Sequence, residues 1–262
     1  MPSAIGHHWL LLRGLTREAG HWGEFITLLQ SRFPDSRIST LDLPGTGQRH
    51  TEASPCHIAE IIETLRHQAL SRRLLQQPLS LIGLSLGGMV TWEWMLRYPE
   101  DVGGAVLINT SLADASPFYH RLRWQAYPSL FKLLFQANDF RRESAVIRCV
   151  ANRRDLAPQI ATEWADIQAK RPVTLNNTLR QIKAAASYRP GDVKPEPPIL
   201  LLTSRNDRLV SPACSDAIQR KWHLTQLNHP WGGHDLTLDD GPWVADRLGE
   251  WVERLRSETK AI

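Results

Sequence analysis

The chain has 262 residues, of which 42% are hydrophobic and 22% charged, a length and composition that suit one globular unit with a single core and one insertion. No apolar stretch approaches the roughly 20 residues that a membrane-spanning helix needs. The amino terminus also lacks a basic segment followed by an apolar one, so we expect a cytoplasmic protein without a membrane span.

The formal net charge of +4 does not indicate a nucleic-acid partner. The basic residues are scattered in short pairs, such as Arg72-Arg73 and Arg153-Arg154, which is typical of a solvated surface. The cysteines, Cys56, Cys149 and Cys214, lie far apart and show no metal-ligand spacing. We therefore expect reduced packing cysteines, no metal, no cofactor and a small-molecule substrate, while the oligomeric state stays open.

Extended apolar segments alternate with helical ones in the first part of the chain. We expect strands at Trp9–Leu12, Arg37–Leu41 and Leu79–Ile82 and in a run ending near Asn109, with helices at Trp22–Arg32, Ile58–Leu75 and Met89–Leu96. Apolar residues recur with a helical period from Ile58 onwards, so that this helix presents one apolar face to a sheet. The alternation favours parallel strands joined by right-handed crossovers.

The alternation resumes near the carboxyl terminus, where we expect a strand at Pro198–Thr203 and a helix at Trp243–Leu255. The residues between, 111–190, contain candidate helices at Tyr119–Gln136 and Ile160–Lys170 and no convincing strand. Pro190 and Gly191 mark the return to the alternating pattern. We therefore expect a core made of residues 1–110 and 191–262, with an insertion at 111–190.

Ser85 stands at the centre of Gly83-Leu84-Ser85-Leu86-Gly87, between an expected strand and an expected helix. A serine in a strained strand-to-helix turn needs small residues two positions away on either side, because neighbouring backbone passes close by. The pattern is common by chance, but the strand before it and the helix after it supply the context that the motif requires. The sequence therefore predicts a nucleophile elbow with its hydroxyl at the carboxyl edge of the sheet.

Segments on both sides of this elbow resemble the α/β-hydrolase superfamily, over nearly the whole chain. Leu10–Leu15 is similar to the strand and loop that usually end in His-Gly, and Leu41–Gly47 resembles the Asp-x-Pro-Gly-x-Gly loop. Tyr98–Asn109 is similar to the segment after the elbow helix, and Leu200–Asp207 with Gly232-Gly233-His234 completes the order Ser, Asp, His. The resemblance implies an α/β-hydrolase fold, a mostly parallel twisted sheet flanked by helices, with residues 111–190 as a helical cap.

The resemblance also implies a catalytic triad. Ser85 is the expected nucleophile, His234 the base that takes its proton, and Asp207 the acid that orients the imidazole. Two nearby histidines are weaker candidates, because His223 precedes an apparent last strand and His229 comes before Pro230 rather than at the end of the loop. The competing acids are better explained as loop and helix-cap residues: Asp235, Asp239 and Asp240.

An oxyanion hole needs two backbone N–H groups, which the resemblance assigns to Leu15 and Leu86. Arg13 departs from the family pattern, which has a histidine there. Its guanidinium could brace the loop against carbonyls or an acid such as Asp42, or it could face the pocket and bind a carboxylate of the substrate.

Aromatic residues of the insertion, including Trp124 and Phe131, could line an apolar substrate pocket, although packing of the cap against the core explains any single one better. We expect a carboxylesterase-like enzyme that cleaves an ester or thioester of a small to medium acyl substrate through an acyl-serine. Two alternatives stay open: a lyase or carbon-carbon bond hydrolase with the same triad, and a ligand receptor on the same fold without enzymatic activity.

Overall fold

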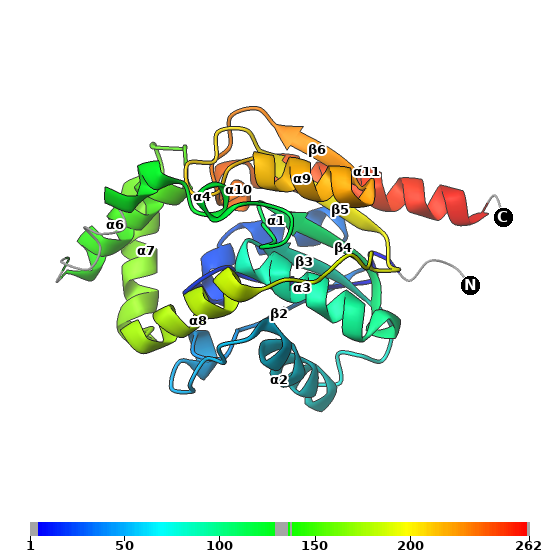
Figure 1. Ribbon diagram of the computed structural model, residues 1–262, viewed down its shortest axis with the longest axis horizontal. Coiled ribbons are helices and arrows are strands. Elements are labelled where there is room, and N and C mark those ends of the chain that lie inside the picture. Colours follow the sequence, from blue (N-terminus) through cyan, green and yellow to red (C-terminus); the bar gives the residue numbers. More distant parts are fainter. Residues whose placement is uncertain (1–4, 129–135, 137, 261–262) are drawn as a thin grey trace.

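A computed structural model describes residues 5–128, 136 and 138–260 of the chain. At its centre lies a six-stranded sheet in the order β2-β1-β3-β4-β5-β6, and every neighbouring pair is parallel (Figure 1). The strands are β1 (His8–Leu12), β2 (Arg37–Leu41), β3 (Leu79–Leu84), β4 (Val102–Ile108), β5 (Ile199–Ser204) and β6 (Thr225–His229).

Side chains alternate between the two faces of the sheet, as parallel strands covered on both faces require. In β1, Leu10 and Leu12 join one hydrophobic cluster while Trp9 and Leu11 join the other. The same alternation holds in β3, β4 and β5, where the side chains are buried almost throughout. The continuous apolar runs of the sequence are therefore strands in the middle of a three-layered core.

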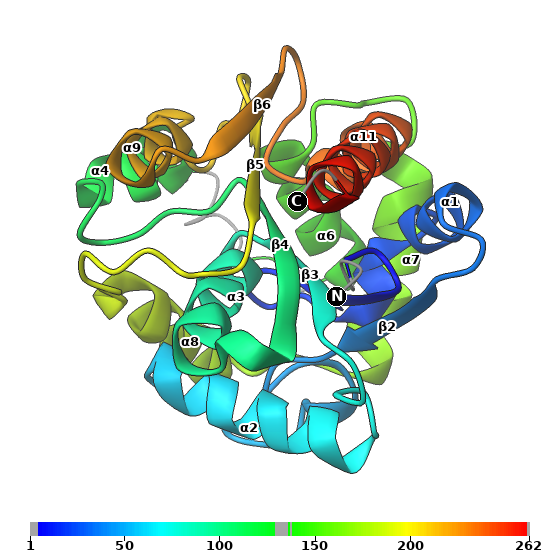
Figure 2. The same cartoon turned by 90° about the vertical axis from the view of Figure 1, so that its right-hand side faces the viewer.

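Helices cover both faces. One face carries α1 and α11, and the other carries α2, α3 and α9 (Figure 2). Their bounds are α1 (Phe25–Arg32), α2 (Ile58–Ser71), α3 (Leu86–Arg97), α9 (Ala213–Trp222) and α11 (Gly241–Lys260). Short helices fill the connections: η1 (Ala19–Trp22), η2 (Gly47–Arg49), η3 (Pro99–Asp101) and α10 (Leu236–Asp239).

The described residues between β4 and β5 form only helices and connecting chain. These helices are α4 (Phe118–Arg121), η4 (Trp124–Ala126), α6 (Asp139–Val150), α7 (Ala157–Lys170) and α8 (Leu175–Ser187). We call α6, α7 and α8 the cap helices; they lie together on the left of Figure 1, away from both ends of the chain. Ala184 of α8 joins the core cluster on one face of the sheet, so this helix is packed directly on the core.

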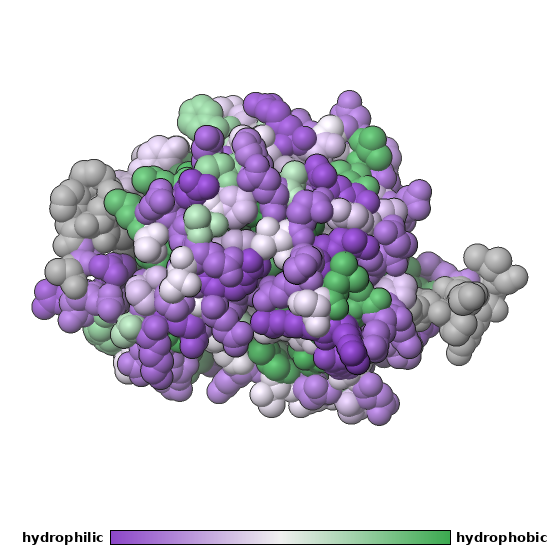
Figure 3. All heavy atoms as spheres, turned by 90° about the horizontal axis from the view of Figure 1, so that it is seen from below, coloured by the Kyte–Doolittle hydropathy of each residue, from purple (hydrophilic) through white to green (hydrophobic). Residues whose placement is uncertain are grey.

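Several helix predictions need correction. The helix expected from Trp22 begins at Phe25, because Trp22 belongs to η1, and α2 ends at Ser71 rather than at Leu75. The helix expected over Tyr119–Gln136 is interrupted at Leu122, whose backbone is extended with φ −140° and ψ 105°. The prediction for 129–135 lies outside the described residues. The elbow helix begins at Leu86 rather than at Met89, because the turn at Ser85 leads directly into it. On the face seen in Figure 3, described hydrophobic residues are dispersed among hydrophilic ones.

Candidate active site

Ser85 occupies the sharp turn between β3 and α3. Its backbone has φ 57° and ψ −115°, an uncommon conformation for a residue with a side chain. The turn is held at both ends, since Ser85 N donates to Ile108 O over 2.9 Å and the Thr110 hydroxyl donates to Ser85 O over 2.8 Å. The surrounding contacts therefore stabilise a conformation that is costly in isolation.

Backbone atoms pass close to the two glycines around Ser85, as the sequence motif predicts. A Cβ atom on Gly83 would lie 2.5 Å from the carbonyl oxygen of Gly87. A Cβ atom on Gly87 would collide with the carbonyl oxygen of Leu12, at the end of β1. Glycine is required at both positions because backbone, which cannot move aside, occupies the space of a side chain.

His234 and Asp207 form a buried pair at the same edge of the sheet. Nδ1 of His234 lies 2.7 Å from Oδ2 of Asp207, and the two residues are only 4% and 1% exposed. A carboxylate accepts hydrogen bonds only, so Nδ1 carries the proton and Nε2 is left as a base. The other oxygen, Oδ1 of Asp207, accepts from the N–H groups of Leu209 and Val210, which fixes the carboxylate.

Asn109, at the end of β4, ties the histidine loop to the sheet. Its Nδ2 donates to the carbonyl oxygens of His234 (2.8 Å) and Gly233 (3.2 Å), while its Oδ1 accepts from Ser204 N. Because Ser85 N bonds to the preceding residue, Ile108, one short segment positions both the elbow and the histidine loop. The sequence analysis placed Asn109 only as the end of a strand. Its backbone has a positive φ of 48°, which asparagine tolerates better than most residues, and no signal in the sequence alone indicated this role.

Burial and charge act in opposite directions on His234. Burial lowers the pKa of its imidazole, but the charges of Asp207 and Asp235 and the hydrogen bond with Asp207 together raise that pKa by more. The Arg13 guanidinium offsets part of the increase. The pKa of His234 therefore lies above its ordinary value of 6.5.

The hydroxyl of Ser85 makes no hydrogen bond with another described residue, and Nε2 of His234 has none either. Ser85 is half-buried, at the carboxyl end of β3, while Asp207 and His234 follow β5 and β6. Catalytic hydrogen bonds are often long in an enzyme without substrate and shorten when the substrate binds. The sheet brings all three loops to one edge, as the topology predicts.

Leu86 and Leu15 both present free backbone N–H groups. Leu86 is the first residue of α3, where an N–H has no partner within the helix. Leu15 follows Gly14, at which a Cβ atom would lie 3.2 Å from Cβ of Ser85. Within the described part of the chain, neither N–H donates a hydrogen bond. Two unengaged donors next to Ser85 match the arrangement that an oxyanion hole needs.

Arg13 is buried beneath this loop, but its partner is not Asp42. Its Nη2 lies 2.5 Å from Oδ2 of Asp235, and its guanidinium stacks on Trp22 with 4.7 Å between Cζ and the ring centroid. Asp42 instead accepts the N–H groups of Ala19 and Gln48. The bracing interpretation of Arg13 therefore has structural support, with the acid supplied by the histidine loop.

The competing residues have other partners. Nε2 of His229 lies 3.1 Å from Asp240, and Nδ1 accepts from Gly232 N over 2.8 Å, so neither nitrogen is free. Asp239 accepts the N–H groups of Asn152 and Gly233. The contacts of His229 and Asp239 therefore hold the loops around His234 together, and neither residue is left free to act as the base or the acid.

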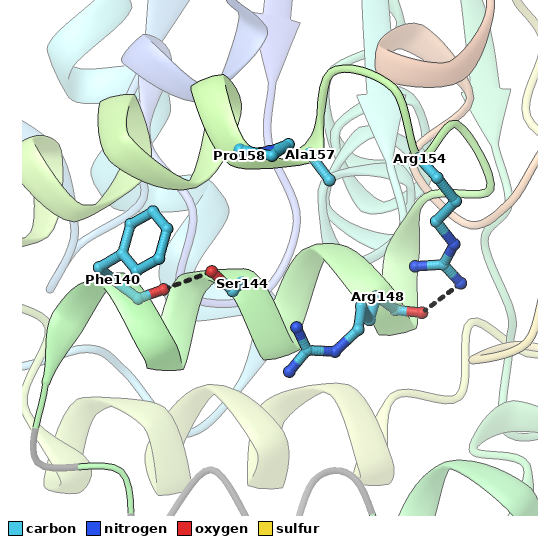
Figure 4. Close-up of a pocket in the computed structure, with 6 residues that line it drawn as sticks. All are labelled: Phe140, Ser144, Arg148, Arg154, Ala157 and Pro158. Carbon is cyan, nitrogen blue, oxygen red and sulfur yellow. Dashed lines mark hydrogen bonds between the residues drawn. The ribbon is translucent and has the colours of Figure 1, made fainter.

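The proposed pocket residues are less well defined. Trp124 is 66% exposed on η4, and Phe131 lies outside the described residues. A hollow of about 260 Å³ opens between α6 and α7, lined by Phe140, Ser144, Arg148, Arg154, Ala157 and Pro158 (Figure 4). A second, of about 700 Å³, is lined by Arg123, Asn152, Arg205, Asn206, Arg208 and Trp231. Neither is lined by Ser85 or His234, so the roles of Trp124 and Phe131 stay proposals.

The described residues offer neither a metal-ligand cluster nor a membrane-spanning helix. They contain no cluster of three or more His, Cys, Asp or Glu side chains that could hold a metal ion. None of the described helices is both long enough and apolar enough to cross a membrane.

A parallel sheet with a serine elbow at its carboxyl edge defines a class of α/β enzymes. The chain belongs to the alpha/beta hydrolase family, whose model matches residues 9–247, and this confirms the predicted family and fold class. A thermophilic esterase from Thermogutta terrifontis has a similar structure, with a TM-score of 0.70 over 95% of this chain and 90% of that one. Its sequence identity is 17%, so this likeness shows the fold alone.

The curated relatives include esterases. The pimeloyl-[acyl-carrier protein] methyl ester esterase of Shewanella woodyi is 24% identical over 249 residues, which are 89% of this chain and 91% of that protein. The enzyme of the same name from Yersinia enterocolitica is 33% identical over 102 residues, 39% of this chain and 36% of that protein. The chain thus spans only about a third of the length of that relative.

Proposed function

We propose that this protein is a serine esterase that cleaves an ester or thioester of a small to medium acyl substrate through an acyl-serine intermediate. The observation that carries the proposal is the 2.7 Å bond from His234 Nδ1 to Asp207, at the sheet edge that also holds the Ser85 elbow. This bond fixes the imidazole tautomer that leaves Nε2 free to act as a base. Membership of the hydrolase family and the esterase relatives support the same reaction.

The reaction follows from these groups. Nε2 of His234 takes the proton of Ser85 as its oxygen attacks the substrate carbonyl carbon, and the carbonyl oxygen becomes negative. The N–H groups of Leu15 and Leu86 stabilise that charge. The bond to the leaving alcohol or thiol then breaks as His234 returns the proton to it. Water attacks the acyl-serine by the same steps, which releases the acid and restores Ser85.

We also assign residues 111–190 the role of a cap, with 1–110 and 191–262 as the core. The cap helices follow β4, whose end carries Asn109, and the chain returns to the core at β5. In this arrangement the substrate enters between the cap and the sheet edge, with Trp124 as a proposed apolar contact; the corresponding proposal for Phe131 lies outside the described residues.

The test combines turnover with covalent labelling. Short p-nitrophenyl esters, methyl esters and thioesters should be hydrolysed, and a fluorophosphonate probe should label Ser85. Ser85→Ala should lower kcat by roughly 10³-fold or more without unfolding the protein. The matched control is Ser187→Ala, because Ser187 is an exposed serine on α8. Labelling of another serine, or full turnover by S85A, contradicts the proposal.

A further inference from the structure

Consecutive residues of the loop after β1 bind different cap helices. The N–H group of Thr16 donates to Oε1 of Gln181 on α8 over 2.9 Å. The guanidinium of the next residue, Arg17, lies with Nη1 2.6 Å from Oε2 of Glu143 on α6. Gln181 is fully buried and Glu143 is 2% exposed, so the cap side of each contact is shielded from solvent.

The third residue in the row, Glu18, is held by the end of α7. Nε of Arg171 donates to Oε2 of Glu18 over 2.7 Å, and Nη2 donates to Oε1. Trp164 of α7 makes a second contact with the loop, because the Arg17 guanidinium lies 4.9 Å from the centroid of the Trp164 ring. Each of the cap helices therefore contacts the same stretch of loop.

This stretch directly follows the proposed oxyanion donor. Thr16 has φ 58°, an unfavourable backbone conformation for a residue branched at Cβ. A loop in a strained conformation persists only where surrounding contacts fix it. The hydrogen bond to Gln181 is such a contact, one residue away from Leu15. Nε2 of Gln181 also lies 3.5 Å from Pro44 O, which orients the amide.

We propose that Gln181 is a positioning residue that completes the oxyanion hole from the cap. By holding the Thr16 N–H, it fixes the peptide that follows Leu15 and aims the Leu15 N–H at the developing oxyanion. The inference rests on the proposed esterase function, and it adds that the cap is part of the catalytic geometry rather than only a cover.

The first variant is Gln181→Met, which keeps the length of the side chain and removes the acceptor. Loss of one oxyanion donor costs roughly 10² to 10³-fold in kcat, and a displaced donor retains part of its effect. We therefore expect kcat to fall by roughly 10 to 100-fold with KM changed by less than about 3-fold, because the contribution of this donor is largest in the transition state.

The chain offers a matched control on the same helix. Asn177 lies one turn before Gln181, is 4% exposed and likewise binds backbone, accepting from Ser54 N and donating to Glu52 O. Asn177→Leu therefore removes a comparable buried amide whose partners lie outside the oxyanion loop. We expect N177L to lower thermal stability about as much as Q181M and to retain kcat.

A second measurement separates positioning from general loosening. A trifluoromethyl ketone forms a tetrahedral adduct with a nucleophilic serine, and its oxyanion occupies the same hole. In Q181M its affinity should fall by the same factor as kcat/KM, while the pH at which activity rises should not move, because His234 and Asp207 are untouched. In N177L the affinity should stay at the wild-type value.

A conservative variant tests rescue. In Gln181→Glu, a protonated carboxyl can accept from Thr16 and donate to Pro44 as the amide does, whereas an ionised carboxylate places a negative charge near the oxyanion. The ratio of Q181E to wild-type kcat should therefore rise as pH falls. If Q181M does not fold, the pH dependence of this ratio still tests the positioning role of Gln181.

The outcomes are distinct. If wild-type protein hydrolyses esters through Ser85 but Q181M keeps its kcat and analogue affinity, or N177L loses kcat equally, the positioning role is wrong and the esterase function stands. A ratio for Q181E that stays well below one at every pH also contradicts it. If wild-type protein hydrolyses no ester and Ser85 is not labelled, both proposals fall together.

Discussion

Arg13 and Asp235 form a buried ion pair, with Nη2 of Arg13 2.5 Å from Oδ2 of Asp235 and both side chains at most 4% exposed. Arg13 precedes the Gly14-Leu15 turn and Asp235 follows His234, so the pair joins the loop of the proposed oxyanion hole to the loop of the proposed base. Because each charge needs the other when water is excluded, the two loops should be displaced together if either residue is replaced.

Replacement of Arg13 should affect stability and all substrates alike. Arg13→Met leaves the Asp235 carboxylate buried without its partner, and the free energy of unfolding should fall by about 3 to 5 kcal/mol in urea denaturation. The loss of kcat should be the same for neutral and anionic esters, and Arg13→Lys should show a smaller effect on both. A KM rise confined to anionic esters, with stability unchanged, would instead assign Arg13 to substrate recognition.

Replacement of Asp235 should move the pH dependence of activity. The charge of Asp235 raises the pKa of His234, and that of Arg13 lowers it. Asp235→Asn removes the first effect and leaves the second, so the pKa of His234 falls. Since a neutral imidazole is the active form, kcat/KM should begin to rise at a lower pH than in the wild type.

The measurement for Asp235 is a profile of kcat/KM over about pH 5 to 9. Glu253→Gln is the control, because this acid forms an ion pair with Arg32 at the surface, with a side chain 66% exposed. Its profile should coincide with that of the wild type. An unchanged or upward-shifted profile in D235N would show that the charge of Asp235 does not raise the pKa of His234.

The buried histidines His229 and His234 should respond differently to the same substitution. His234→Gln should lower kcat by roughly 10³-fold or more and abolish the rise of activity with pH. His229→Gln should keep both, with reduced stability, because His229 uses its two nitrogens to bind Asp240 and Gly232. The reverse result in steady-state kinetics and thermal melts would transfer the role of base to His229.

The elbow glycine Gly87 should not tolerate a methyl group. In Gly87→Ala the new Cβ atom collides with Leu12 O and lies 2.8 Å from Arg13 O, so the loop of the proposed oxyanion hole must shift. We expect a kcat loss of roughly 10²-fold, because small displacements of catalytic groups are costly. Gly241→Ala is the control, since its Cβ atom meets only the ends of the Leu28 and Phe25 side chains. Equal activity of G87A and wild type would argue against a rigid elbow.

The strands were predictable because their apolar runs are long and regular, and the elbow because its glycines bracket a serine between a strand and a helix. Two cap helices, α6 and α8, escaped prediction for a physical reason. The buried face of α8 carries Asn177 and Gln181 besides Ala184, and that of α6 includes Glu143. In α8, Leu175, Leu179 and Ile182 do recur with a helical period, but they lie on the exposed side of the helix, so the apolar pattern does not mark the face that packs on the core.

The partner of Arg13 could not be found from sequence either. A buried guanidinium requires an acid, but the two residues are 222 positions apart, and several acids precede or follow the core strands. Asp42 was a reasonable candidate because it follows the neighbouring strand β2, yet its oxygens satisfy backbone N–H groups of its own loop and of Ala19. The choice between acids depends on how the loops cross, which only the folded chain defines.

The contacts of Thr16, Arg17 and Glu18 with three separate cap helices also set a condition for protein engineering. A cap transplanted from another hydrolase would lack Gln181, Glu143 and Arg171, and would leave a glutamate, an arginine and a strained peptide of the host without partners. Grafting a cap to change substrate preference should therefore succeed only when the donor's own segment after β1 replaces Thr16, Arg17 and Glu18 as well. The cap and this short segment depend on each other and have to be exchanged together.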